Sequence, residues 1–82
     1  MKIQAGSKLL FQGDSVTDAG RTRPISEGLH NPLGGGYPNL VNGLLTAVYP
    51  ERMIRVVNMG NSGDNTRALL NRWQTDTLDL KP

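Results

Sequence analysis

The chain has 82 residues, with nine Lys or Arg against seven Asp or Glu, which gives a formal net charge of +2. The positive charges are scattered along the chain and aromatic residues are few, so we expect neither a nucleic-acid interface nor a membrane-binding patch. There is no Cys, which excludes disulfides and thiolate metal sites. A chain this short buries a small fraction of its surface, so its own core would be marginal.

The first residues, 1–6, contain no long apolar run. We therefore expect neither a signal peptide nor a transmembrane segment. The expected location is cytoplasmic.

The apolar run over residues 8–12 is closed by Gly13 and Asp14, which predicts a buried strand. Residues 18–36 are rich in Gly and Pro and contain almost nothing apolar, so they are expected to form a loop. The triple glycine at 34–36 has neither of the spacings found in phosphate-binding loops, so no phosphate site is expected there.

A helix is predicted after this loop, beginning near Pro38 and ending at Pro50. Its apolar side chains share one face: Leu40, Val41, Leu44, Leu45 and Val48. Gly43 inside this helix costs about 1 kcal/mol relative to Ala. We expect it to allow close packing on a sheet.

Residues 53–58 are rich in β-branched side chains and predict a second strand, followed by a loop over 59–63. Asp64 or Asn65 can cap a second helix. One stripe of that helix contains Leu69, Leu70, Trp73 and Thr77. Trp73 is expected to lie in the core.

The order strand, helix, strand, helix predicts an α/β protein with a parallel sheet and right-handed crossovers. Two parallel strands do not make a stable sheet, because parallel sheets are normally covered on both faces. Residues 1–82 are therefore expected to be one part, the first half or less, of a larger three-layer α/β/α domain.

Both strands end in a Gly-containing turn, and such turns at the carboxyl ends of parallel strands face one crevice. Ser15 lies in the first turn, at the start of a short helical segment whose N–H groups are unpaired. Gly13 permits that turn, whereas Gly63 in the second turn lets a substrate approach and offers its own N–H. Together these groups could attack an ester and stabilise its oxyanion.

A serine nucleophile needs a general base, usually a His oriented by a carboxylate. The chain has one His, His30, in the Gly- and Pro-rich loop. A mobile loop holds a base poorly, so we expect His30 to be a substrate-side or solvated residue and the base to come from elsewhere. The Asp residues have no spacing typical of a metal site, and no cofactor is expected.

Simpler interpretations of both turns stay open. Gly13-Asp14-Ser15 could be a turn capped by the Asp14 side chain, and residues 61–64 could be a helix-capping loop.

Residues 9–21 (LLFQGDSVTDAGR) resemble the first conserved block of the SGNH (GDSL) hydrolases, and residues 56–66 (VVNMGNSGDNT) resemble the second. Within that family the chain is most similar to the bacterial acetylxylan-esterase group. The residues that carry this closer similarity lie in segments 36–38, 47–51 and 72–82. The resemblance covers residues 2–82 and implies a flavodoxin-like SGNH hydrolase fold, of which this chain is the N-terminal portion.

The resemblance also implies roles for single residues. Ser15 would be the nucleophile and an oxyanion donor through its N–H, and Gly63 would be a second donor. Asp14 would support the turn without joining the triad. The family's third-block Asn and late Asp-x-x-His have no counterpart in these 82 residues. Val16 replaces the Leu of the family motif, and Asn61 stands where relatives often have an aliphatic residue, which could alter the acyl pocket.

We therefore expect a serine ester hydrolase that works through an acyl-enzyme on Ser15. It would be a carbohydrate acetylesterase or a short-chain esterase or lipase, with a small acylated substrate such as an acetylated oligosaccharide. The chain alone is expected to be inactive, and homo-oligomers or association with a missing C-terminal part are both compatible with it. The alternatives are a non-catalytic α/β binding or interaction module and, less favoured, a flavodoxin-like nucleotide binder with a phosphate at the Gly13 turn.

Overall fold

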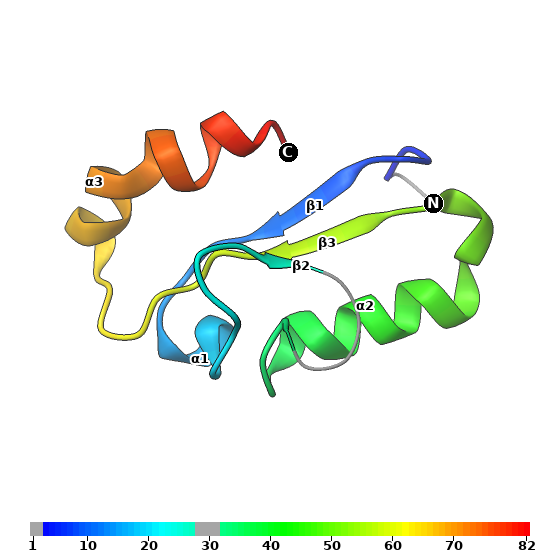
Figure 1. The fold of residues 1–82 in the computed structure, drawn as a ribbon, viewed down its shortest axis with the longest axis horizontal. Coiled ribbons are helices and arrows are strands. Elements are labelled where there is room, and N and C mark those ends of the chain that lie inside the picture. Colours follow the sequence, from blue (N-terminus) through cyan, green and yellow to red (C-terminus); the bar gives the residue numbers. More distant parts are fainter. Residues whose placement is uncertain (1–2, 28–31) are drawn as a thin grey trace.

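A parallel β-α-β unit followed by a helix forms the frame of the molecule, as the sequence predicts (Figure 1). The structure, a computed structural model, describes residues 3–27 and 32–82. Its elements in chain order are β1 (Lys8–Phe11), α1 (Ser15–Asp18), β2 (Ser26–Glu27), α2 (Tyr37–Val48), the 3₁₀ turn η1 (Pro50–Arg52), β3 (Arg55–Asn58), α3 (Thr66–Asp76) and the 3₁₀ turn η2 (Leu78–Leu80). Strands β1 and β3 are parallel neighbours, with Leu9 opposite Val56 and Leu10 opposite Val57.

The expected loop over residues 18–36 contains a short strand, β2, so the sheet is mixed and not purely parallel. Strand β2 runs antiparallel to β3, with Ser26 opposite Asn58 and Glu27 opposite Val57, and the strand order is β1-β3-β2. This pairing covers the edge of β3 that β1 leaves open. A two-residue strand has no hydrophobic run of its own, so its sequence gives no strand signal.

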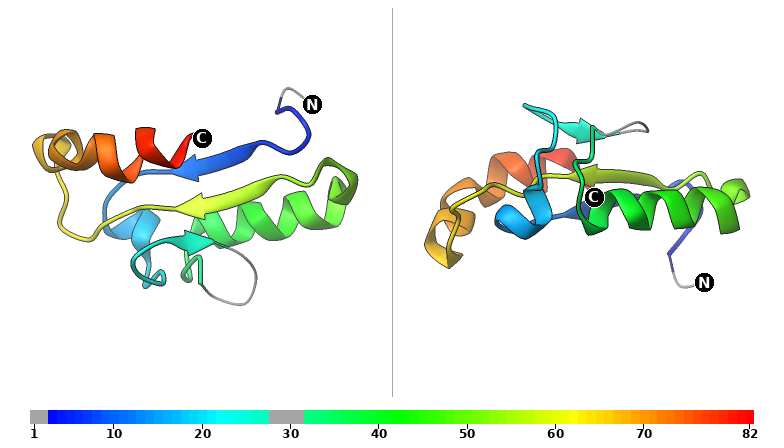
Figure 2. Two further views of the ribbon diagram at one scale, coloured as in Figure 1. Left: turned by 45° about the horizontal axis from the view of Figure 1, so that its top comes forward. Right: turned by 90° about the horizontal axis from the view of Figure 1, so that it is seen from below.

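Helix α2 packs along β3 with a narrower apolar face than predicted (Figure 2). Pro38 and Asn42 are its buried residues. Three members of the predicted stripe are largely exposed instead: Leu40 by 73%, Leu44 by 63% and Val48 by 53%. The expectation for Gly43 is wrong as well, because it is exposed and a Cβ there would meet no atom within 4 Å.

Helix α3 starts at Asn65, one of the two predicted caps, and polar contacts attach α3 and η2 to β1 and the residue that follows it. The Asn65 side chain accepts a hydrogen bond from the Ala68 N–H at 2.9 Å. Lys8 Nζ donates to the carbonyl oxygen of Leu80 at 2.6 Å, and Gln12 Nε2 donates to that of Asp76 at 2.8 Å. Trp73 is 40% exposed, so the expected core position is wrong for the part of the chain that the structure describes.

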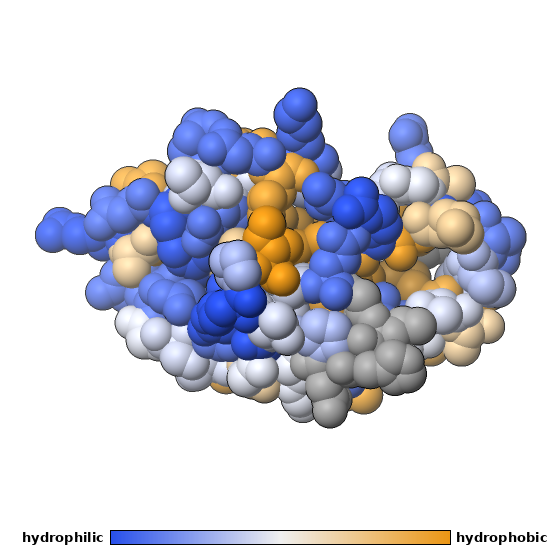
Figure 3. Space-filling model, viewed as in Figure 1, coloured by the Kyte–Doolittle hydropathy of each residue, from blue (hydrophilic) through white to orange (hydrophobic). Residues whose placement is uncertain are grey.

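The core is small and mixed in character. Its buried apolar side chains are Leu33, Val56, Val57 and Met59. The buried polar or charged residues outnumber them: Thr17, Asp18, Arg21, Ser26, Asn42, Asn58 and Thr77. Figure 3 shows apolar surface running from η2 across the sheet toward β2, flanked by hydrophilic groups. No helix within residues 3–27 and 32–82 is long and apolar enough to cross a membrane.

Candidate functional site

The turns that follow β1 and β3 lie side by side. The Met59 N–H donates to the Phe11 carbonyl at 2.8 Å, and the Asn61 N–H donates to the Gly13 carbonyl at 2.9 Å. These bonds continue the parallel pairing beyond both strand ends. The structure therefore brings together the two turns that contain Ser15 and Gly63.

Ser15 is the first residue of α1, and its side chain is exposed. Asp14 precedes it as the N-cap, and its Oδ1 accepts a hydrogen bond from the Val16 N–H at 3.1 Å. Such a cap fixes the entry into the helix, which is the supporting role that the sequence suggests for Asp14. Within the described segments the Ser15 N–H has no hydrogen-bond acceptor.

Gly63 lies at the tip of a four-residue turn over 61–64, closed by the Asp64 N–H donating to the Asn61 carbonyl at 3.1 Å. Its φ of +85° at the third position of the turn is the conformation for which type II turns require glycine. Gly63 is exposed, and a Cβ there would meet no atom within 4 Å. Its N–H also finds no acceptor in the described part of the chain. The position is therefore open to an incoming group.

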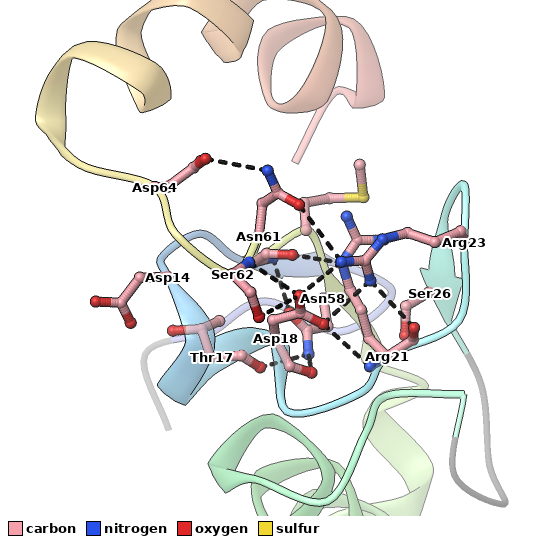
Figure 4. A network of polar contacts seen from close by, with 12 residues as sticks. Asp14, Thr17, Asp18, Arg21, Arg23, Ser26, Asn58, Asn61, Ser62 and Asp64 are labelled. Carbon is pink, nitrogen blue, oxygen red and sulfur yellow. Dashed lines mark hydrogen bonds and ion pairs between the residues drawn. The ribbon is translucent and has the colours of Figure 1, made fainter.

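Asp18, at the end of α1, connects the two turns through a buried carboxylate. Its side chain is 4% exposed, and its Oδ2 accepts from Arg23 Nη2 at 2.6 Å, from the Ser62 N–H at 3.0 Å and from the Ser62 hydroxyl at 3.1 Å. Figure 4 shows these bonds converging on Asp18 while the Asp14 side chain points away from them. Hydrogen bonding by Arg23 lowers the pKa of Asp18 well below its usual range, against burial, which raises it; Ser62 also lowers it.

Asn58, the last residue of β3, is fully buried and bonds to three segments. Its Nδ2 donates to the carbonyls of Thr17 at 2.7 Å and Leu33 at 2.8 Å, and its Oδ1 accepts from the Gly60 N–H at 2.9 Å. A Cβ at Gly60 would lie 2.6 Å from the Asp18 backbone nitrogen, so only glycine lets α1 approach this closely. We call Asp18, Arg21, Asn58 and Ser62 the polar junction.

Arg21 belongs to this junction because its side chain turns inward. It is 8% exposed, and its Nε donates to the Gly60 carbonyl at 2.6 Å. Burial lowers the pKa of Arg21, and the neighbouring Arg23 adds to that effect. The guanidinium therefore holds the backbone at Gly60, directly before the turn that contains Gly63.

Arg72 of α3 also bonds to the loop that contains Gly63. Its Nε donates to Asp64 Oδ2 at 2.6 Å and its Nη1 to the Met59 carbonyl at 2.8 Å. Its Nη2 reaches the Gly13 carbonyl at 3.3 Å. The hydrogen bond from Arg72 holds the pKa of Asp64 below its ordinary value. Both turns are thus fixed to α3 as well as to each other.

The glycines at 34–36 have a packing role in place of the phosphate role that the sequence already disfavours. A Cβ at Gly34 would lie 2.5 Å from the Asp18 carbonyl oxygen, and one at Gly36 would lie 2.8 Å from the Val16 carbonyl oxygen. The loop therefore rests directly on the backbone of α1. Glycine is required at positions 34 and 36 because the two backbones approach closely there.

The described residues contain no group of three or more His, Cys, Asp or Glu that could hold a metal ion. His30 lies outside the described residues, so its expected role stays a prediction. The catalytic roles of Ser15 and Gly63 also stay predictions at this stage, although the structure brings their turns together.

Sequence reasoning missed the residues that hold this site together: Asp18, Arg21, Asn58 and Arg72. All four are polar or charged and look like surface or turn residues in the sequence. A usable signal existed for all four, because Asp18 and Arg21 fall inside the first motif, Asn58 inside the second, and Arg72 in the segment 72–82 that carries the closer similarity.

Comparisons with known proteins point to one group. No protein-family model matches the chain. The acetylxylan esterase of Geobacillus stearothermophilus is 57% identical over all 82 residues, and the chain spans 37% of its length. The solved structure of that enzyme, Axe2, matches the whole chain with a TM-score of 0.97. An α/β hydrolase from the metagenome of Lake Arreo, LAE5, is 53% identical over 98% of this chain and 37% of its own, with a TM-score of 0.92.

Variants of Axe2 also match the chain. One is described as a catalytic mutant in which the serine at position 15 is replaced by alanine; it is 56% identical and has a TM-score of 0.97. Two other catalytic mutants replace a histidine and an aspartate at positions beyond the length of the present chain. The chain is therefore a homologue of part of this acetylxylan esterase, which confirms its predicted similarity to the acetylxylan-esterase group.

Proposed function

We propose that this chain supplies the nucleophile and two oxyanion donors of a serine esterase that removes acetyl groups from xylo-oligosaccharides. The observation that carries the proposal is the bond between the Asn61 N–H and the Gly13 carbonyl, which joins the turn of Ser15 to that of Gly63. The substrate class comes from the Geobacillus enzyme, which is described as an acetyl-xylooligosaccharide esterase. The chain spans 37% of that enzyme, so the activity belongs to a longer assembly of residues.

In this proposal the Ser15 oxygen attacks the acetyl carbonyl carbon while a general base takes the hydroxyl proton. The N–H groups of Ser15 and Gly63 donate to the developing oxyanion, which strengthens their bonds in the transition state. Collapse of the tetrahedral intermediate expels the sugar oxygen, which takes the proton from the base and leaves as a hydroxyl. The base then takes a proton from the water that attacks the acyl-enzyme, and the second tetrahedral intermediate collapses to acetate and Ser15, whose oxygen receives that proton.

The general base belongs outside these 82 residues. Support comes from the catalytic mutants of Axe2, in which the substituted histidine and aspartate lie beyond the span matched by this chain. The direct test is therefore a chimera: residues 1–82 of this chain followed by the remaining length of Axe2. Its identity of 57% to the segment it replaces makes a folded product feasible.

We expect the chimera to hydrolyse 4-nitrophenyl acetate and acetylated xylo-oligosaccharides. Ser15→Ala should lower kcat at least about 10⁴-fold, because the nucleophile acts as a unit with its base. The 82-residue chain by itself should show no turnover. Undiminished hydrolysis by the Ser15→Ala chimera, with its fold intact by circular dichroism, would contradict the proposal. Cytoplasmic location and homo-oligomer formation stay predictions from the sequence.

A further inference from the structure

Asp18 has more hydrogen-bond partners than a helix end requires. Its Oδ1 accepts from the Arg21 N–H and from Arg23 Nη1, both at 3.1 Å. Its Oδ2 accepts both the N–H and the hydroxyl of Ser62, in addition to Arg23 Nη2. The carboxylate is therefore fully engaged, and it reaches across to a segment 44 positions away in the chain.

We propose that Asp18 is a positioning residue that holds the Ser62–Gly63 peptide in the geometry required of an oxyanion donor. This inference rests on the proposed function. Asp18 would touch neither the substrate nor the reacting atoms. It would act through Ser62, which directly precedes Gly63.

The geometry of α1 makes this connection short and stiff. Ser15 and Asp18 are the first and last residues of one helical turn. That turn is closed by the Asp18 N–H donating to the Asp14 carbonyl at 2.8 Å and by the Ala19 N–H donating to the Ser15 carbonyl at 2.9 Å. A carboxylate fixed to this turn and bonded to Ser62 ties the nucleophile directly to the loop of the second donor.

Gly63 needs such support because it has little of its own. Its N–H has no acceptor within residues 3–27 and 32–82, and its open surroundings do not fix it by packing. The two ends of the turn are held by other residues: Asn61 bonds to Gly13, and Asp64 bonds to Arg72. At the tip, the bonds that the structure shows for Ser62 are those that its N–H and hydroxyl donate to Asp18. An oxyanion donor displaced by about 1 Å can lose on the order of 10²-fold in rate.

The first test uses the 82-residue chain and does not depend on any activity. In ¹⁵N-labelled chain, Asp18→Asn should speed amide hydrogen exchange at Ser62 about tenfold and lower the backbone order parameter of Gly63, because a charge-assisted bond is lost. Ser62→Ala is a milder second variant that keeps the pair of Asp18 with Arg23. Unchanged exchange at Ser62 and unchanged order at Gly63 in Asp18→Asn would overturn the proposal.

The second test measures kinetics in the chimera, normalised to active sites titrated by the acyl-enzyme burst. Asp18→Asn and Ser62→Ala should lower kcat per active site about 10- to 100-fold and leave KM within about twofold, because the oxyanion forms only in the transition state. Ser62→Thr, which keeps both donors, should restore most of the rate. A purely structural role would lower the number of active sites and leave kcat per site unchanged, and that result would overturn the proposal.

Glu27→Gln is the matched control for the loss of a carboxylate. Glu27 pairs with Arg55 on β2 and β3, away from Ser62, and its bonds do not include the second turn. This variant should keep both the exchange rate at Ser62 and kcat per site. If Ser15→Ala fails to reduce turnover, the proposed function is wrong, and the exchange measurement still decides whether Asp18 holds the loop.

Discussion

The polar junction and the outer face of α2 are opposites in composition and in burial. In the junction, Asp18, Arg21 and Asn58 are polar, and each is 8% exposed or less. On α2, Leu40 and Leu44 are apolar, and each is more than 60% exposed. The usual pattern of apolar residues inside and polar residues outside is thus reversed in these two regions.

The reversal separates a region whose polar groups find hydrogen-bond partners within the chain from a region whose apolar side chains stay uncovered by the described residues. A buried polar group costs free energy unless it is bonded, and the groups of the junction find partners within the chain. The apolar side chains on the outer face of α2 would be stabilised by being covered, and the described residues leave them exposed. The 82 residues therefore build one corner of a site with high precision while leaving a helix face uncovered by the described residues.

The largest effect should come from removing the most deeply buried side chain of the junction, that of Asn58. Asn58→Ala should lower the free energy of unfolding by about 3 kcal/mol, because it leaves the Gly60 N–H and the Thr17 and Leu33 carbonyls buried without partners. Denaturant unfolding followed by circular dichroism measures this loss. Asn71→Ala, at an exposed position of α3, is the matched control and should change little. Equal effects of both substitutions would mean that the junction does not stabilise the fold.

Acid should weaken the junction through Asp18. Folding lowers the pKa of this carboxyl below its ordinary value of about 3.9, so its stabilisation is complete above about pH 5 and is lost as the pH falls toward the folded pKa. The difference in free energy of unfolding between the wild-type chain and Asp18→Asn should therefore shrink steadily below pH 5. Ser15→Ala on the same helical turn has no titrating group at the changed position, so its difference from wild type should stay constant. A constant difference for Asp18→Asn would show that its charge is not stabilised in the folded chain.

The outer face of α2 should give the smallest effect. Leu44→Gln in the 82-residue chain should change the free energy of unfolding by less than about 0.5 kcal/mol, as is usual for exposed positions. Unfolding at two protein concentrations provides the measurement. A loss of more than about 1 kcal/mol in the free energy of unfolding, growing with protein concentration, would show that a second copy of the chain covers this face. The outer face of α2 would then no longer differ from the junction in being uncovered.

The main elements could be predicted from local signals. The strand closed by Gly13, the helix between Pro38 and Pro50 and the Asn65 cap each depend on nearby residues, and each appears in the structure within a few positions. Local signals failed for β2, whose two residues pair only because β3 lies beside them. They also failed for Gly43 and Trp73, because helical periodicity shows that residues share a face without showing what covers it.

The sequence by itself determined the order of strands and helices, the two glycine turns and the family resemblance, because these follow from residue spacing and from short motifs. Only the tertiary structure decided that Asp18 and Asn58 face inward and join those turns. Buried polar residues are indistinguishable from surface ones along a chain, since what permits their burial is a set of hydrogen bonds from distant segments. Those bonds exist only after β1 and β3 have paired.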